Sequence, residues 1–285
     1  TARPALVAKG KSFAAYAVRW PAFGDVNAEG LLLRPSGKPP FRYVIAIPDA
    51  GQTPEMIAAL SEGVEAGSQF ARRLVESGCA VLIPTIINRE ISRRRLTNRE
   101  FLYRSAFEMG RHLAGYEVQK VLAAVDWVSR NAGDRDPSIG VMGWGEGGFL
   151  ALFAGALDTR SDAVCVSGSF DEREGVWQEP IDRNVFGLLE QFGDAELAAM
   201  VVTPLYPHQA VPFSSVRFSL AVPLDRSLVF VAEDLPKRGM RLVADGRPLD
   251  GASRVEVLDS ARRITLLRAE NMGFAEVLSR KIIGG

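Results

Sequence analysis

A glycine-rich turn between a predicted strand and a predicted helix constrains this chain more than any other feature. Residues 140–148 read Gly-Val-Met-Gly-Trp-Gly-Glu-Gly-Gly. The apolar run Ile139–Gly143 is typical of a buried strand, and the apolar stretch Phe149–Leu157 is typical of a helix. Four glycines within six residues allow a positive φ and a close approach of backbones. We therefore expect a sharp strand–turn–helix bend at this point.

The first 170 residues alternate between short apolar runs and helical patterns. The predicted strands are Phe13–Trp20, Glu29–Arg34, Tyr43–Ile47, Ala80–Pro84, Ile139–Gly143 and Asp162–Ser167. The predicted helices are Ser68–Ser77, a long helix from about Arg99 to Arg130, and Phe149–Leu157. Wholly apolar strands that alternate with helices indicate a mostly parallel sheet covered on both faces. We expect an α/β fold with three layers, α/β/α.

The pattern changes after residue 203, where helical periodicity largely disappears. Short strands are predicted at Val216–Val222, Leu228–Ala232, Met240–Ala244, Val255–Leu258 and Ile264–Leu267. The dipeptide Asp245-Gly246 predicts a hairpin turn. We expect residues 1–203 to form the α/β domain and residues 204–285 a β-rich segment. That segment is either a partial β-sandwich, which the strand spacing favours, or the end of the same domain.

Composition excludes some classes of partner. The chain has 34 basic and 34 acidic residues, and this balance argues against nucleic acid as a partner. No apolar stretch reaches the roughly 18 residues that a membrane span needs. Cys79 and Cys165 lie in or beside predicted buried strands, where we expect small apolar filler. Because the chain begins at Thr1, we expect a processed, trimmed or partial soluble protein, either cytoplasmic or exported with its leader removed.

The glycine turn matches a catalytic motif with one substitution. Gly143-x-Gly145-x-Gly147 has the spacing of the nucleophile elbow Gly-x-Ser-x-Gly, with Gly145 in the position of the serine. A glycine has no side chain, so Gly145 cannot attack a carbonyl or form an acyl-enzyme. The sequence therefore predicts the backbone of an elbow without its nucleophile.

Two other interpretations of the turn remain open. Gly143-x-Gly145-x-x-Gly148 also fits the dinucleotide-binding fingerprint Gly-x-Gly-x-x-Gly. That fingerprint usually follows the first strand of its unit, whereas this turn follows at least four predicted strands, and Glu146 would place negative charge near a phosphate. The second interpretation is a structural strand-to-helix turn that does not derive from a catalytic site.

Residues from about 10 to 200 resemble the α/β-hydrolase superfamily, of the acetyl xylan esterase or dienelactone hydrolase-like kind. The resemblance rests on Ile47–Gly51, on Gly115–Val121 and on the Trp144–Gly148 turn. The segment from Trp177–Ile181 through Phe192–Asp194 is similar to part of large bacterial hydrolase-like proteins. The resemblance implies a Ser–His–Asp triad, ester substrates with carbohydrate or small acyl groups, and no metal or cofactor.

The resemblance assigns the nucleophile and the oxyanion-binding positions. The nucleophile position maps to Gly145. The oxyanion loop maps to Asp49-Ala50-Gly51, whose backbone N–H groups are candidate donors, and Glu146 would offer a second N–H. Asp49, Ala50, Gly145 and Glu146 are therefore the predicted binding residues.

The acid and the base of a triad map less clearly. Asp234 follows a late predicted strand and is the first candidate for the acid, and Asp171 is a weaker one. The candidate base is His208, although it precedes Asp234, whereas the order in this fold is Ser, acid, His. His112 falls inside the long predicted helix, where we expect a packing or surface role. Glu146 is a further candidate as a base for water.

Three functions follow as hypotheses. The first is a hydrolase-fold protein without serine-esterase activity that binds a small molecule or carbohydrate, or acts as a scaffold. The second is an active ester hydrolase with a non-standard catalytic group, and the third is a nucleotide-binding enzyme. Arg241–Leu249 is similar to a hairpin of sugar-binding β-sandwich domains, which favours a carbohydrate partner. We expect no metal, nucleic-acid or membrane partner, and the sequence leaves the oligomeric state open.

Overall fold

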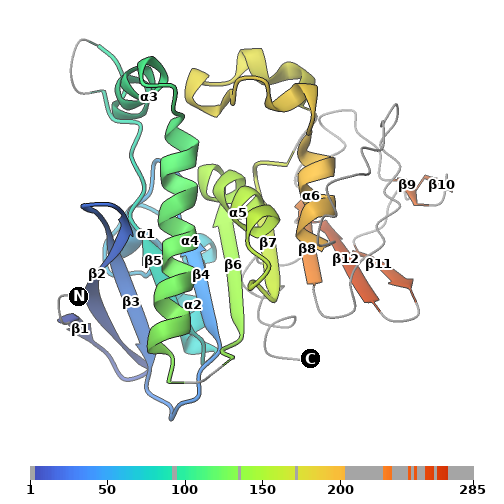
Figure 1. The fold of residues 1–285 in the computed structure, drawn as a ribbon. Coiled ribbons are helices and arrows are strands. Elements are labelled where there is room, and N and C mark those ends of the chain that lie inside the picture. The colour runs from blue at the N-terminus through green and yellow to red at the C-terminus, as the bar shows by residue number, and fades with distance from the viewer. Residues whose placement is uncertain are drawn as a thin grey trace.

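A single ten-stranded sheet forms the centre of the computed structural model (Figure 1). Residues 4–91, 95–133, 136–170 and 173–202 are described, together with strands between residues 227 and 268. The order in the sheet is β1-β2-β3-β5-β4-β6-β7-β8-β12-β11. The bounds are β1 Ala5–Lys9, β2 Phe13–Phe23, β3 Val26–Pro35, β4 Tyr43–Ile47, β5 Ala80–Pro84, β6 Ile139–Trp144, β7 Ala163–Ser167, β8 Ser227–Ala232, β11 Arg254–Asp259 and β12 Arg262–Arg268.

The central strands run parallel and the edges antiparallel. β5, β4, β6, β7, β8 and β12 pair in parallel, whereas β1, β2 and β3 pair antiparallel at one edge and β11 at the other. Every residue of β4 and β5 is buried, as expected for strands covered on both faces. The predicted mostly parallel sheet is confirmed.

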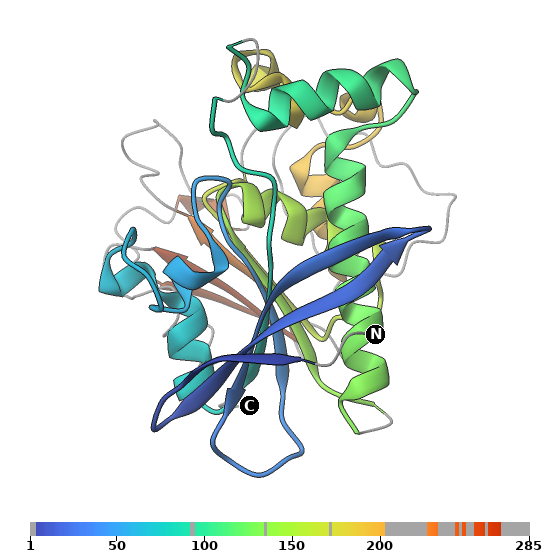
Figure 2. The same ribbon diagram turned by 90° about the vertical axis from the view of Figure 1, so that its left-hand side faces the viewer.

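Helices cover both faces of this sheet (Figure 2). On one face, Ile45 and Ile47 of β4 belong to the core under α4 (Leu113–Asn131), α5 (Glu146–Leu157) and α6 (Asp194–Val202). On the other face, Val44 and Ala46 pack with α1 (Pro54–Ile57) and α2 (Phe70–Glu76). Alternate side chains of one strand thus enter opposite cores, because successive residues of a strand point to opposite faces. The three-layer α/β/α prediction is confirmed.

The long helix predicted from about Arg99 to Arg130 is wrong, because the chain forms two helices there. α3 (Asn98–Glu108) ends before Gly110, which has φ +67°, and α4 begins at Leu113. Gly110 adopts the left-handed conformation that commonly stops a helix. His112, predicted to lie inside the helix, is the residue that caps the N-terminus of α4. The predicted apolar stripe is buried, and it belongs to α4 alone: Ala114, Val118, Val121, Val125 and Val128.

Other elements differ from prediction at their ends. β1 was not predicted, and β2 continues through Pro21 to a turn at Gly24-Asp25. α5 begins at Glu146, three residues before the predicted start at Phe149. Cys79 and Cys165 are free and buried in the apolar core, as expected.

The strands described after residue 226 include three that extend the same sheet, namely β8, β12 and β11. β9 (Val243–Ala244) and β10 (Arg247–Pro248) form a separate antiparallel pair in which Ala244 faces Arg247, as a hairpin around Asp245-Gly246 requires. The predicted strand Val216–Val222 lies outside the described residues. The division of the chain at residue 203, and the choice between sandwich and sheet for the whole segment, stay predictions.

A cap lies beyond the carboxyl end of β6 (Figures 1 and 2). We use this name for α3 together with the 3₁₀ turns η2 (Arg173–Gln178), η3 (Ile181–Arg183) and η4 (Leu188–Glu190). α3 contacts both η3 and α4. Among the described residues, no helix is both long and apolar enough to cross a membrane.

Candidate functional site

The glycine turn has the predicted backbone geometry. Gly145 follows β6, has φ +57° and ψ −118°, and caps the N-terminus of α5. Its N–H donates to Ser167 O at 2.9 Å, and its carbonyl accepts from the N–H of Phe149 at 3.1 Å. A positive φ at this position is costly for residues other than glycine. The strand–turn–helix bend predicted from the sequence is confirmed.

The glycines around Gly145 are required by space rather than by φ. A Cβ on Gly143 would overlap the carbonyl of Gly147, and a Cβ on Gly147 would overlap the carbonyls of Ile47 and Pro48. A Cβ on Gly148 would overlap the carbonyl of Ser167. α5 therefore packs so closely on the ends of β4, β6 and β7 that no larger residue fits.

The Asp49 carboxylate occupies the space in front of the bend. Asp49 follows β4, and its Oδ1 accepts the N–H of Glu146 at 2.7 Å. A Cβ built on Gly145 would overlap the same oxygen. The N–H of Asp49 donates to Gln52 Oε1 at 3.2 Å, and the N–H of Gly51 donates to Asp49 Oδ2 at 3.4 Å. Three backbone donors predicted for an oxyanion are thus engaged within the protein.

The side chain of Glu146 is fully buried among three arginines. Glu146 Oε2 lies 2.7 Å from Arg89 Nη2 and 2.9 Å from Arg183 Nε, and Oε1 lies 3.0 Å from Arg99 Nη2. A general base needs a lone pair within reach of the proton that it takes. Here both carboxylate oxygens are engaged by guanidinium groups, and the catalytic role predicted for Glu146 stays a prediction.

Arg99 lies at the centre of a buried cluster of charges. Its guanidinium contacts Asp182 Oδ2 at 2.7 Å, Glu117 Oε2 at 2.8 Å and Glu146 Oε1 at 3.0 Å, and its side chain is wholly inaccessible to solvent. Arg89 binds Asp182 with both η nitrogens, at 3.0 and 3.1 Å. We call these six residues the charge cluster: Arg89, Arg99, Glu117, Glu146, Asp182 and Arg183. Because α3 and η3 contribute Arg99, Asp182 and Arg183, the cluster ties the cap to the first residue of α5.

The pKa values of Asp182 and Arg99 are those of ion-paired groups. Burial alone would raise the pKa of Asp182, but hydrogen bonds from Arg89 and Arg99 and their charges outweigh burial and lower it. Burial alone would lower the pKa of Arg99, but the charges of Glu117 and Glu146 and hydrogen bonds to Glu117 and Asp182 raise it. Asp182 and Arg99 therefore hold their charges in the folded protein, because each has partners of opposite sign.

Sequence reasoning missed the charge cluster, apart from Glu146. Arg89, Arg99 and Arg183 lie far apart in the chain and match no motif. A signal did exist at Glu117, which lies three residues after Ala114 and therefore on the apolar face of α4. A charged residue on a buried helix face requires a partner, although the sequence does not say which.

The structure does not describe the acid and base candidates of the predicted triad. Asp171, His208 and Asp234 lie outside the described residues. Ala50 is buried, and its carbonyl accepts the N–H of Arg89 at 3.3 Å. In the part of the chain that is described, no group of three or more His, Cys, Asp or Glu residues could hold a metal ion.

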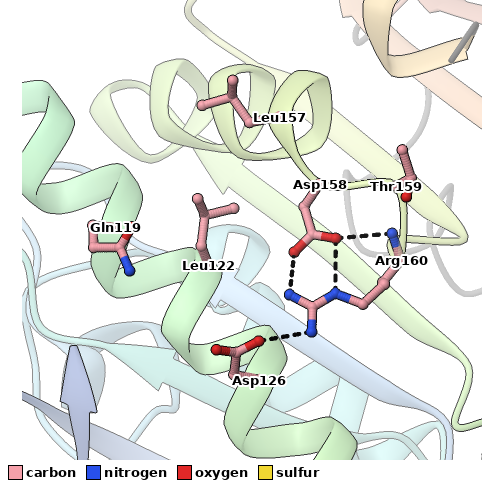
Figure 3. A pocket seen from close by; sticks show the side chains of 7 residues that line it. All are labelled: Gln119, Leu122, Asp126, Leu157, Asp158, Thr159 and Arg160. Carbon is pink, nitrogen blue, oxygen red and sulfur yellow. Dashed lines mark hydrogen bonds and ion pairs between the residues drawn. The ribbon is translucent and has the colours of Figure 1, made fainter. Parts of the chain in front are cut away.

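A shallow hollow of about 380 Å³ lies between α4 and the end of α5 (Figure 3). Arg160 projects into it and is bound by two carboxylates, Asp158 Oδ2 at 2.6 Å and Asp126 Oδ1 at 2.7 Å. The hollow is lined by residues other than those of the elbow: Gln119, Leu122, Asp126, Leu157, Asp158, Thr159 and Arg160. The charge of the Arg160 guanidinium is therefore neutralised by carboxylates of the protein itself.

Comparisons with solved structures identify the fold of this chain, whereas comparisons of its sequence find no relative. No protein-family model and no curated protein matches the sequence. An acetyl xylan esterase from Paenibacillus sp. R4 superposes with a TM-score of 0.59 at 13% identity, over 99% of this chain and 88% of that one. A candidate acetyl xylan esterase from Bacteroides fragilis NCTC 9343 gives a TM-score of 0.56 at 15% identity, over 81% of this chain and 63% of that one. A cold-adapted esterase from an Arctic intertidal metagenomic library gives a TM-score of 0.50 at 14% identity, over 98% and 97%.

The chain has the α/β-hydrolase fold. The resemblance predicted from the sequence is thus confirmed at the level of fold. In the α/β-hydrolase fold, a strained strand-to-helix turn at the top of the sheet carries the catalytic serine. The bend at Gly145 has that backbone form.

Proposed function

We propose that this chain is a carboxylesterase-related α/β-hydrolase-fold protein that does not carry out serine-esterase chemistry at its elbow. The observation that carries the proposal is the 2.7 Å bond from the N–H of Glu146 to Asp49 Oδ1. In hydrolases of this fold, the N–H of the residue after the nucleophile helps to bind the oxyanion of the tetrahedral intermediate, and the corresponding N–H of this chain binds the Asp49 carboxylate.

Acyl transfer at an elbow needs a nucleophile and free oxyanion donors. Gly145 supplies no nucleophile, and loss of the serine nucleophile alone typically costs about a million-fold in rate. The fixed carboxylate of Asp49 would also repel the negative charge that develops on a substrate carbonyl oxygen. Two requirements therefore fail at the same place, and a single back-substitution at residue 145 would repair only one of them.

The likeness to acetyl xylan esterases supports a small acyl or carbohydrate ligand for this chain, bound without turnover, or a scaffold role in a complex. Neither alternative function has a specific observation in its favour. A non-standard hydrolase would need a free base, and Glu146 is engaged by three arginines. A dinucleotide would place its pyrophosphate at the N-terminus of α5, where Asp49 already puts negative charge.

The test uses p-nitrophenyl acetate for turnover and a fluorophosphonate probe for covalent labelling. We expect the folded protein to match its heat-unfolded control in both assays. Gly145→Ser should also stay inactive and unlabelled, because Asp49 Oδ1 fills the space of the new side chain. Saturable hydrolysis or labelling of the unaltered folded protein would refute the proposal.

A double variant separates the two defects at the elbow. Gly145→Ser combined with Asp49→Ala frees both the space and the Glu146 N–H, so any remaining base and acid of a triad would then act. Asp25→Ala, in the exposed β2–β3 turn, is the control for loss of an aspartate. If Gly145→Ser alone hydrolysed the ester above the heat-unfolded control and as fast as the double variant, Asp49 would not block the elbow.

A further inference from the structure

Exposed apolar side chains gather on the cap. Among the residues whose exposure the structure describes, thirteen large apolar side chains are exposed, and eight of these lie in the cap or within two residues of its elements. Scattered exposed apolar residues are ordinary on a protein surface, whereas a group of this size marks a place where something binds. We call the eight residues the cap patch: Phe101, Leu102, Phe107, Met109, Trp177, Ile181, Phe186 and Leu189.

The two halves of the cap patch belong to one fixed surface. The first half comes from α3 and its C-cap residue, and the second half from the segment η2–η4. α3 contacts η3, and Arg99 of α3 binds Asp182 of η3 at 2.7 Å within the charge cluster. Figures 1 and 2 both show these elements together at the end of the molecule beyond β6. A partner would therefore meet a surface that is already formed.

The size of the cap patch suits a stable protein interface. Trp177 and Phe186 are 74% and 86% exposed. At about 150–250 Å² for a large side chain, the exposed fractions of the eight residues correspond to roughly 700–1,100 Å². The largest apolar patch of a typical monomer is about 300–600 Å², and each partner in a standard interface covers about 800 Å². Trp, Phe and Met are also the residues that interface centres favour.

The exposed charges beside the patch have both signs. Glu108 and Glu190 oppose approach to an anionic membrane or to nucleic acid. Arg104, which pairs with Glu100 at 2.7 Å, and Arg111 oppose a strongly cationic partner. A surface with both signs is compatible with a second copy of itself, because a two-fold axis brings different positions of the same surface together. We propose that the cap patch is the interface of a two-fold dimer of this chain.

Sedimentation equilibrium of the full chain tests the proposal. We expect twice the mass of one chain, and dissociation to single copies on dilution. Interfaces of standard size bind with micromolar or tighter dissociation constants, so a chain that stays monomeric at about 100 µM overturns the proposal. A mass that grows beyond two copies also overturns it, because a two-fold interface closes after two.

Charged substitutions show whether the dimer uses the cap patch. Trp177→Glu and Phe186→Glu alter side chains that are mostly exposed in the single chain, so both variants should fold, which thermal unfolding confirms. Each should weaken the dimer about a hundredfold, since a loss of about tenfold at one residue counts twice in a two-fold interface. Leu157→Glu is the matched control: Leu157 is 61% exposed at the end of α5, outside the patch, and its dissociation constant should not change.

Three results would assign the patch to something else. The proposal is overturned if neither cap variant weakens the dimer, or if Leu157→Glu weakens it as much as they do. It is also overturned if the chain is a monomer that sediments with phosphatidylserine vesicles, because the patch would then bind a lipid surface. None of these measurements depends on the chemistry of the elbow.

Discussion

Replacing Arg99 with methionine tests whether the charge cluster holds the cap in place. Methionine keeps much of the length of the side chain and removes the guanidinium. Three carboxylates then lose a partner within 3.0 Å, those of Glu117, Glu146 and Asp182. Glu146 and Asp182 keep Arg89, whereas Glu117 keeps its hydrogen bond from the N–H of Ile87 at 2.8 Å and the more distant charge of Lys120. Of the three carboxylates, that of Glu117 therefore loses the largest share of the interactions that compensate its buried charge.

The expected loss in the free energy of unfolding is about 3 kcal/mol. Removing one partner of a buried ion pair typically costs about 3–5 kcal/mol, since the other charge stays buried without compensation. The lower part of this range applies because two of the three carboxylates retain an arginine. With a urea m-value of about 3 kcal/mol/M, the unfolding midpoint should fall by about 1 M. The total stability of such proteins is about 5–15 kcal/mol, so the variant should still fold.

Urea unfolding of both proteins at pH 7 and pH 5 measures this loss. The deficit should shrink at pH 5, because an unpaired buried carboxylate takes up a proton more readily than a paired one. Arg104→Met is the matched control on the same helix, since Arg104 pairs with Glu100 at 2.7 Å on the exposed face. Exposed pairs contribute at most about 1 kcal/mol. An Arg99→Met midpoint no lower than that of Arg104→Met would refute the reasoning.

Three further outcomes follow from the described residues. Gly143→Ala should destabilise the protein by about 1–3 kcal/mol, because the new Cβ would overlap the carbonyl of Gly147. Gly115→Ala is the control, since Gly115 lies on α4 with open space around it, and this variant should be neutral or stabilising. Thermal unfolding compares the two variants. Asp182→Asn should flatten the acid limb of the stability curve. Burial alone would raise the pKa of Asp182, but the hydrogen bonds and charges of Arg89 and Arg99 outweigh burial and lower it, and this net lowering gives stability that is present above about pH 4 and lost as pH falls below it. A variant with an unchanged acid limb would contradict this. Burial raises the pKa of Cys79 and Cys165, so neither thiol should react with Ellman's reagent before unfolding, and both should react in denaturant; fast labelling of the native protein would count against the buried placement.

Local patterns predicted much of the fold. β4 and β5 coincide with the predicted runs because five consecutive apolar residues between turn signals are typical of a buried strand. The prediction failed between residues 99 and 130, where two helical patterns follow each other closely. The break at Gly110 depends on one residue in the left-handed conformation, whereas the sequence prediction continues the helix across it.

The glycines and the apolar runs by themselves determined that a strand bends sharply into a helix at Gly145 and that no hydroxyl is present there. Only the tertiary structure decided what fills the bend, since Asp49 lies 97 residues before the N–H that it binds. It also decided that Glu146 meets arginines from three other segments of the chain. Periodicity and turn chemistry act between near neighbours, whereas a buried charge is stabilised by whichever partners folding brings within a few ångströms.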